Sequence, residues 1–173
     1  DSNIFIKDIT TLNKLGFIPI IVHGGGKRIN NKLNELGIES EFIKGLRVTR
    51  QETIEVVEQV LIKFNQEIVE ALKNQSCNSE TINSKTNNII SVTKENDVLG
   101  FVGTPTKIDK NIIDKIVNEK KVPVIAPLGL DESNQTYNIN ADTAAGSIAK
   151  KIEARRLIIM SDVEGVLDLS LIH

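Results

Sequence analysis

The chain has 173 residues, of which 40% are hydrophobic, 25% charged and 3% aromatic, and its formal net charge is −2. This composition fits one globular domain and excludes a disordered or fibrous chain. Because Lys and Arg are scattered among acidic residues, no basic stripe for nucleic acid is expected, and a small molecule is the expected partner. A single cysteine excludes an internal disulfide, and two histidines form no Cys/His cluster for structural zinc, so no metal ligand is predicted.

No targeting or membrane segment is apparent in the sequence. No run approaches the ~20 apolar residues of a membrane span. The opening residues DSNIFIKDIT lack the basic region and apolar core of a secretory signal. We therefore expect a cytoplasmic protein. The abundance of Asn, Ile and Lys is typical of an AT-rich coding sequence and leaves the plastid stroma as an alternative.

The first third of the chain predicts two helices around a buried strand. The opening helix is expected to end at Gly16, a residue type common at helix C-termini. Residues 17–22, FIPIIV, form the β-branched apolar run typical of a parallel strand covered on both faces. Three glycines at 24–26 follow it, and apolar residues then recur at helical spacing over 27–36.

The longest predicted helix follows residues 49–52, TRQE, which have the form of a capping box centred on Thr49. One apolar stripe then continues from Ile54 to Leu72. The next stretch, residues 73–88, is polar and rich in turn formers, and is predicted to be a mobile loop.

The second half continues the alternation of strands and helices. Two short segments, 89–93 and 99–103, suggest a β-hairpin, and Asp109 is placed to cap a helix. Three further elements are expected in order: a buried strand at 122–127, a helix at 141–152 and a buried strand at 156–162. This alternation predicts an α/β fold, a three-layer αβα sandwich with a mainly parallel central sheet.

The glycine run HGGG lies where such folds bind ligands, at the carboxyl end of a strand and the start of a helix. Glycines there let backbone amides approach an anion, although a tight turn is the alternative. The spacing matches neither a P-loop nor a dinucleotide fingerprint, because Ile21 and Ile29 stand where those motifs need glycine. His23 is interpreted as a hydrogen-bonding residue of the core or of the loop, and not as a base.

Three polar residues alternate in YNINAD, namely Asn138, Asn140 and Asp142. If this stretch is extended, their side chains share one face and can bind a polar substrate. The alternative is that Asn140 or Asp142 only caps the following helix.

Two further features are candidates for ligand contacts. Arg47, in GLRVT, could bind a substrate carboxylate through its guanidinium, or could lie in a surface ion pair. The turn that contains Ser161, Asp162 and Gly165 could contact a nucleotide, or could be only a tight exit from a strand.

Six motifs together resemble the N-acetylglutamate kinases, a branch of the amino acid kinase family. They are IVHGGG, GLRVT, GFVG, VPVIAPLG, YNINADTAAGSIA and LIIMSDVEGVLD. The resemblance implies an open αβα sandwich that phosphorylates the side-chain carboxylate of N-acetyl-L-glutamate with ATP and Mg²⁺, in arginine biosynthesis. Residues 1–173 would be a single partial kinase domain, made of the substrate lobe and the start of the nucleotide lobe.

The same resemblance implies roles for the candidate residues. Gly25 and Gly26 would offer amides to the substrate and to the transferred phosphoryl group. Arg47 and Asn138 would hold the substrate's α-carboxylate and amide region, and Asp142 would organise the catalytic lysines. The residues expected to contact the nucleotide are Ser161, Asp162 and Gly165.

The chain departs from the family pattern in two places. The family's two catalytic lysines would lie before residue 1 and after residue 173, so we expect an internal fragment that is inactive alone. The loop at 83–87, NSKTN, keeps Lys85 but lacks the glycines of the family's SGKDG-like loop.

Two alternatives to this function stay open. One is a sibling kinase for aspartate, glutamate, carbamate or uridylate, and the other is a non-catalytic binding module. The expected partners are N-acetyl-L-glutamate and ATP, a second copy of the chain in a homo-oligomer, and a nitrogen-signalling regulatory protein as a further candidate. Neither nucleic acid nor a membrane is expected.

Overall fold

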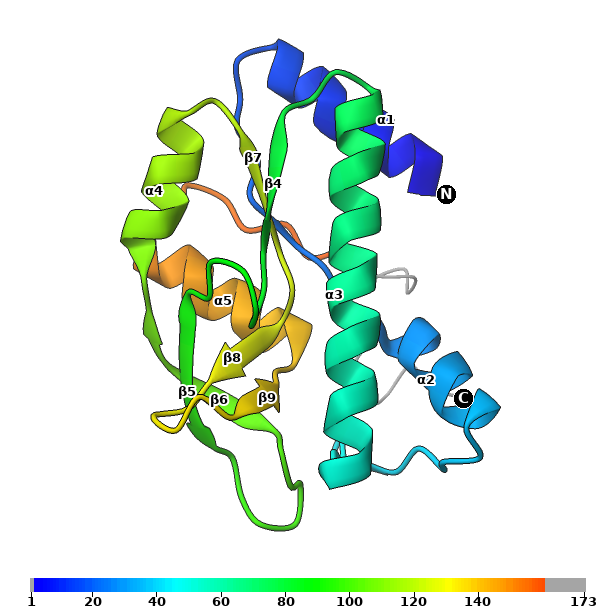
Figure 1. Ribbon diagram of the computed structural model, residues 1–173. Helices are drawn as coiled ribbons and strands as arrows, with labels where there is room; N and C mark the ends of the chain where they lie inside the picture. Colours follow the sequence, from blue (N-terminus) through cyan, green and yellow to red (C-terminus); the bar gives the residue numbers. More distant parts are fainter. Residues whose placement is uncertain (1, 161–173) are drawn as a thin grey trace, which may run out of the picture.

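The computed structural model describes residues 2–160, which fold into three layers around a parallel sheet (Figure 1). The layers consist of α1 (Ser2–Lys14), β1 (Ile21–Val22), α3 (Gln51–Asn74), β4 (Ser79–Ile82), α4 (Lys110–Asn118), β7 (Val122–Ile125) and α5 (Ala141–Lys151). The central sheet has the order β1-β7-β4 with parallel pairing throughout. Helices α1 and α3 cover one face, and α4 and α5 cover the other. The predicted αβα sandwich is confirmed.

Strand β7 shows why the central sheet is covered on both faces. All four of its residues are buried. Val122 and Val124 pack with apolar residues of α1 and α3, whereas Ile125 packs with those of α4 and α5. Successive side chains of a strand point to opposite faces, so a continuous apolar run needs a helix layer on each side.

A second sheet continues from the first and has the strand order β6-β5-β8-β9. Its strands are β5 (Ile90–Lys94), β6 (Gly103–Ile108), β8 (Leu128–Leu130) and β9 (Thr136–Asn138). The chain passes from β7 to β8 through residues 126–127 alone. Helix α2 (Gly26–Glu35) packs against α3, and a short hairpin of β2 (Phe42–Ile43) and β3 (Leu46–Arg47) follows it.

The predicted helices are confirmed with small shifts of their ends. Helix α1 ends before Gly16 and α2 ends before Gly37, and both glycines have left-handed φ values, of 89° and 71°. Asp109 caps α4 as expected, because its Oδ1 accepts a hydrogen bond from the amide of Asn111 at 3.0 Å. The apolar stripe after residue 50 forms the 24-residue helix α3.

The prediction of a mobile loop over 73–88 is wrong, because this stretch contains β4, which pairs with β7 from Ser79 to Ile82. Polar side chains order it. Ser79 Oγ donates to the Val69 carbonyl at 3.2 Å, and Asn83 Oδ1 accepts from two backbone amides of the following turn. Asn87 adopts a left-handed φ of 55°, so asparagine serves where the family's loop carries glycine.

The predicted capping box at Thr49 is also wrong. The N-cap of α3 is Arg50, and no side chain caps the helix there. Thr49 is fully buried and pairs with Gly100 in a β-bridge, so its hydroxyl donates instead to the Arg47 carbonyl at 3.0 Å. The predicted hairpin partner at 99–103 is displaced along the chain. Gly100 and Val102 make isolated bridges to Thr49 and Asn138, and the strand that pairs with β5 is β6, which begins at Gly103.

The expected buried strand at 156–162 is wrong over the residues that the structure describes. Residues 156–160 form no strand there, and Leu157, Ile158, Ile159 and Met160 are 50–78% exposed. An apolar run becomes a buried strand only where it pairs with a sheet edge, and no described strand pairs with it. Residues 161 and 162 lie outside the described part.

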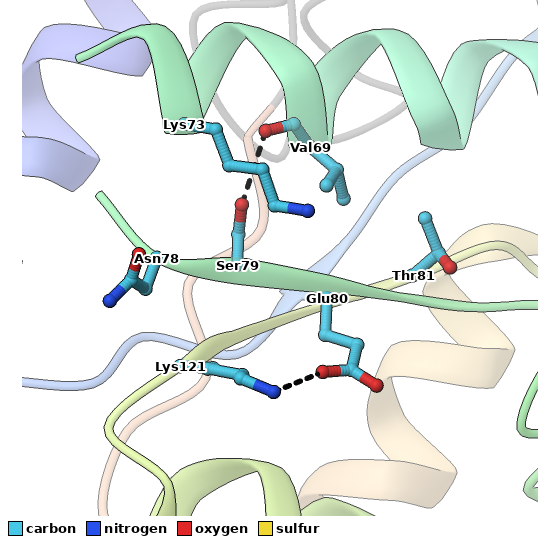
Figure 2. Close-up of a pocket in the computed structure, with 7 residues that line it drawn as sticks. All are labelled: Val69, Lys73, Asn78, Ser79, Glu80, Thr81 and Lys121. Carbon is cyan, nitrogen blue, oxygen red and sulfur yellow. Dashed lines mark hydrogen bonds and ion pairs between the residues drawn. The ribbon is translucent and has the colours of Figure 1, made fainter. Parts of the chain in front are cut away.

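Strand β4 forms one edge of the central sheet, beside a hollow of about 410 Å³ (Figure 2). Lys121 Nζ lies 2.8 Å from Glu80 Oε2 and 2.7 Å from Glu119 Oε2. The hydrogen bonds that Lys121 donates to these carboxylates of Glu119 and Glu80 raise its pKa. Charged side chains along an edge strand discourage unwanted strand pairing.

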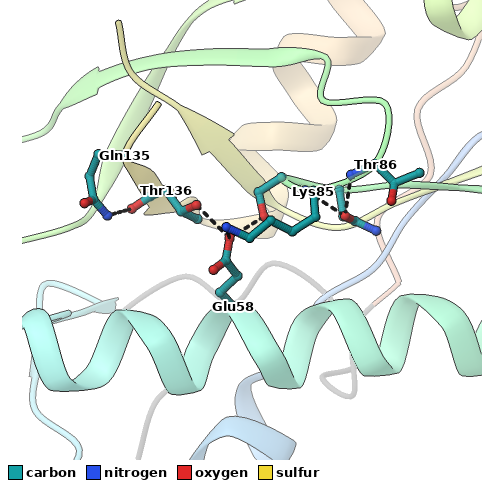
Figure 3. A network of polar contacts seen from close by, with 7 residues as sticks. Glu58, Lys85, Thr86, Gln135 and Thr136 are labelled. Atoms are coloured by element: carbon teal, nitrogen blue, oxygen red, sulfur yellow. Dashed lines mark hydrogen bonds and ion pairs between the residues drawn. The ribbon is translucent and has the colours of Figure 1, made fainter. Parts of the chain in front are cut away.

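Glu58 on α3 joins the two sheets through a polar network (Figure 3). Its Oε1 accepts hydrogen bonds from Ser84 Oγ at 2.6 Å and from Thr136 Oγ1 at 2.7 Å, and Lys85 Nζ lies 3.3 Å away. Burial alone would raise the pKa of Glu58, but the two hydroxyl donors and the Lys85 charge outweigh it and hold this pKa below its ordinary value. The ionised carboxylate thus ties α3 to the loop after β4 and to β9.

We expect the Glu58→Gln variant of the full-length protein to lose about 1–3 kcal/mol of unfolding free energy at pH 7, because two hydrogen bonds lose their charge assistance. A carboxyl group whose pKa is lower in the folded state stabilises that state at pH values above its unfolded pKa. This stabilisation is lost as the pH falls through the folded pKa. The difference from wild type should therefore shrink below about pH 4 in urea unfolding. Glu67→Gln is the control, because Glu67 lies on the same helix as Glu58 but forms only an exposed ion pair with Arg28 of α2, and this variant should change little. If Glu58→Gln lost the same unfolding free energy at pH 7 and below about pH 4, the Glu58 charge would have no role in stability.

Candidate functional site

A hollow of about 200 Å³ lies at the carboxyl ends of β1 and β7. The glycine loop after β1, the β2–β3 hairpin and the segment between β9 and α5 line it. Four of the predicted site residues meet there, namely Gly25, Gly26, Arg47 and Asn138. The structure thus brings together residues that are up to 113 positions apart, from Gly25 to Asn138.

The three glycines of the loop differ in how much space a side chain would find at each position. A Cβ on Gly25 would lie 2.6 Å from Leu61 Cδ2, so a side chain there would require the Leu61 side chain on α3 to move. A Cβ on Gly24 would make only an ordinary contact of 3.9 Å, with Ala141. A Cβ on Gly26 would meet nothing within 4 Å, so its backbone borders open space.

The glycine loop also forms the N-terminus of α2. Gly25 is the N-cap residue, and no side chain caps the helix there. The first amides of a helix have no partner within the helix, and their dipoles favour negative charge. The combination of open space at Gly26 and uncapped amides suits an anionic ligand.

Arg47 is buried beside this loop, with 7% of its surface exposed. Its Nη1 donates to Ser40 Oγ at 2.8 Å, and its Nη2 to the Gly26 carbonyl at 3.4 Å. The guanidinium carbon lies 4.6 Å from the centre of the Phe42 ring. No carboxylate among residues 2–160 forms an ion pair with Arg47.

This lack of a carboxylate partner gives the hollow its electrostatic character. Burial lowers the pKa of the Arg47 guanidinium, but arginine stays charged at physiological pH. A buried charge that has only neutral partners is costly, and a bound anion would offset that cost. The sequence pattern does not point to Ser40 or Phe42, because neither belongs to a periodic segment or a motif.

Asn138 is held in the hollow by a neighbouring segment. Its Nδ2 donates to Thr49 Oγ1 at 3.3 Å, and its backbone amide donates to the Phe101 carbonyl at 2.9 Å. The Phe101 amide in turn donates to the Thr49 carbonyl at 2.7 Å. Gly100 has a φ of 70°, and a side chain there would collide with the same carbonyl. The GFVG motif therefore joins the Arg47 and Asn138 segments.

The expectation that Asn138, Asn140 and Asp142 share one face is wrong for Asp142. Helix α5 already begins at Ala141, so the alternation of an extended chain ends before Asp142. Asn140 lines the hollow and also caps α5, because its Oδ1 accepts from the Thr143 amide at 3.0 Å. Asp142 lies in the first turn of α5, is exposed and does not line the hollow.

The other predicted contacts fall elsewhere. Ser161, Asp162 and Gly165 lie outside the described residues. Within residues 2–160, no three His, Cys, Asp or Glu side chains are grouped closely enough to hold a metal ion. None of the described helices has the length and apolar character needed to cross a membrane.

Comparison with known proteins identifies relatives of this chain. The sequence profile of the amino acid kinase family matches residues 3–170. An acetylglutamate kinase from Pelagibacter ubique is 64% identical over 165 residues, which cover 95% of this chain and 57% of that protein. An acetylglutamate kinase from Roseobacter denitrificans is 44% identical over 163 residues, which cover 94% of this chain and again 57% of the relative. The chain thus spans little more than half the length of these relatives.

A solved structure supports the same relationship. The protein smu.665 from Streptococcus mutans UA159 superposes with a TM-score of 0.88 at 30% identity, over 95% of this chain and 68% of that one. The profile match covers nearly every residue of the chain, and the observed αβα sandwich agrees with it. The chain therefore belongs to the amino acid kinase family.

Proposed function

We propose that the complete protein is an acetylglutamate kinase, which transfers the γ-phosphoryl group of ATP to the side-chain carboxylate of N-acetyl-L-glutamate in arginine biosynthesis. The observation that carries this proposal is Arg47, a buried cation with no carboxylate partner among the described residues. It lies in one hollow with Gly25, Gly26 and Asn138. The names of the relatives from Pelagibacter ubique and Roseobacter denitrificans support the same activity.

In this proposal the hollow binds the amino-acid part of the substrate. The Arg47 guanidinium binds the α-carboxylate through a charge-assisted pair. The Asn138 side chain, oriented by Thr49, meets the amide of the acetylated nitrogen. Apolar side chains of the lining, Leu46, Leu61 and Val102 among them, suit the acetyl methyl group and disfavour the free ammonium group of glutamate.

The glycine loop stabilises the phosphoryl group during transfer. The nucleophile is a carboxylate with an ordinary pKa near ~4.3, so it is ionised at neutral pH and needs no general base. The difficulty is that the anionic carboxylate must approach the anionic phosphates of ATP. Backbone amides at a helix N-terminus offset the negative charge on the oxygens of the transferred group. When bound with ATP, Mg²⁺ would neutralise further phosphate charge.

The remaining predictions fit this proposal. Asp142 in the first turn of α5 would organise catalytic lysines from outside the described residues, and the turn at 161–165 would contact the nucleotide. We further propose a homo-oligomer in the cytoplasm, and the bacterial relatives favour this location over a plastid. A nitrogen-signalling regulatory partner and a single partial kinase domain over residues 1–173 stay predictions.

The identity of the substrate can be tested by trapping the acyl phosphate with hydroxylamine. The full-length protein with ATP and Mg²⁺ should give a hydroxamate from N-acetyl-L-glutamate. Aspartate and glutamate should give far less, because their ammonium groups would be desolvated in the hollow. Equal or larger yields from aspartate or glutamate would favour a sibling kinase for that amino acid. No hydroxamate from any of the three would contradict the proposed reaction and leave a binding module or a kinase for carbamate or uridylate.

The role of Arg47 can be tested by Arg47→Ala in the full-length enzyme. Loss of a charge-assisted pair worth ~1.5–3 kcal/mol should raise the KM for N-acetyl-L-glutamate about 10-fold to 150-fold and leave kcat nearly unchanged. Arg28→Ala is a matched control, because Arg28 is paired with Glu67 on the surface and does not line the hollow. An unchanged KM in Arg47→Ala would show that Arg47 does not bind the substrate.

A further inference from the structure

A buried polar network lies directly behind the glycine loop. His23 follows β1, and its Nδ1 lies 2.8 Å from the Gly24 carbonyl oxygen. Its Nε2 lies 3.1 Å from Nδ2 of Asn65, a residue of α3 that is fully buried. Asn65 Nδ2 also donates to the Val124 carbonyl at 2.9 Å, and its Oδ1 accepts from Asn83 Nδ2 at 3.5 Å.

These partners define one tautomer of His23. A carbonyl oxygen only accepts, so Nδ1 must carry the proton that is donated to Gly24. The Val124 carbonyl requires the amide nitrogen of Asn65 on its side, so this nitrogen also faces His23 and Nε2 must accept. Burial lowers the pKa of His23, the bond to the Gly24 carbonyl opposes this, and the nearby charge of Arg28 lowers it further.

The ring is also enclosed by packing. His23 has 7% of its surface exposed and does not line the hollow. Its ring contacts the Phe64 ring in an edge-on arrangement, with 5.1 Å between centroids, and Arg28 lies over the Phe64 ring at 4.0 Å. With both ring nitrogens bonded, His23 is not available as a base for the substrate.

The bond to Gly24 acts on the rest of the loop through one peptide unit. The Gly24 carbonyl and the Gly25 N–H belong to the same planar trans peptide, so they point in opposite directions. Neither residue of this peptide has a side chain to restrict its rotation, and a Cβ built on Gly24 would make only an ordinary contact with Ala141. No backbone hydrogen bond among the described residues uses the Gly25 N–H. Holding the carbonyl toward His23 therefore turns this free N–H away from the core.

We propose that His23 is a positioning residue for phosphoryl transfer. Its neutral imidazole, held in one tautomer by Asn65, fixes the peptide between Gly24 and Gly25 and thereby aims the Gly25 amide at the transferred group. The role of this amide in transfer rests on the proposed function, whereas the orientation of the peptide does not.

Two substitutions of His23 separate the two bonds of the ring. In His23→Asn, the amide nitrogen takes the place of Nδ1 and can still donate to the Gly24 carbonyl. In His23→Gln, the amide oxygen takes the place of Nε2 and can still accept from Asn65, but the donor to Gly24 is lost. Both variants lose the ring contact with Phe64 and should show similar decreases in Tm.

The kinetic test compares these variants in the full-length enzyme. We expect His23→Asn to keep kcat within about threefold of wild type, and His23→Gln to lower kcat about 10-fold to 100-fold, because a misplaced donor loses its effect in the transition state. The KM for N-acetyl-L-glutamate should change little in either. Equal kcat in the two variants, or losses that follow Tm, would overturn the proposal.

Crystal structures of both variants provide a readout that does not depend on the substrate. The peptide between Gly24 and Gly25 should keep its orientation in His23→Asn and rotate in His23→Gln. If wild-type protein makes no acyl phosphate from N-acetyl-L-glutamate but the peptide still rotates, the proposed function fails and the positioning stands. An unrotated peptide in His23→Gln would overturn the positioning itself.

Discussion

Burial of the Arg47 guanidinium with no carboxylate partner among residues 2–160 carries a free-energy cost, and the site is built around that charge. Ser40, the Gly26 carbonyl and the Phe42 ring supply neutral partners only. Such partners orient the guanidinium toward the hollow but leave its charge uncompensated. A carboxylate ligand would supply the missing partner, which is why the hollow suits an acidic substrate better than a neutral one.

Side chains along one face of helix α3 hold the segments that line the hollow. Glu58, Leu61 and Asn65 are spaced three and four residues apart, so they lie along one side of the helix. Glu58 holds β9 through Thr136, Leu61 fills the space where Gly25 has no side chain, and Asn65 holds His23. One helix thus positions the strand that carries Asn138, the glycine turn and the residue behind it.

Apolar patterns were sufficient to predict the helices and β7, because a helix buries a periodic apolar face and a strand covered on both faces is a continuous apolar run. Strand β4 was missed because SETI looks polar, and its order comes from pairing with β7 and from side-chain bonds that sequence spacing does not reveal. The expectation that Gly25, Arg47 and Asn138 act on one substrate came from the resemblance to the kinase family, and the structure places all three around one hollow. Two features could not be predicted, namely that Arg47 has no carboxylate partner in the described part of the chain and that Asp142 is exposed, since both depend on how distant segments pack.

A crystal structure of the full-length protein with N-acetyl-L-glutamate tests the central claim most directly. A ligand carboxylate should lie about 2.7–2.9 Å from the Arg47 guanidinium nitrogens, with the acetylated amide beside Asn138 and the side-chain carboxylate facing Gly26. Density for the ligand outside this hollow would contradict the claim. An Asp or Glu side chain from beyond residue 160 already paired with Arg47 would contradict it equally.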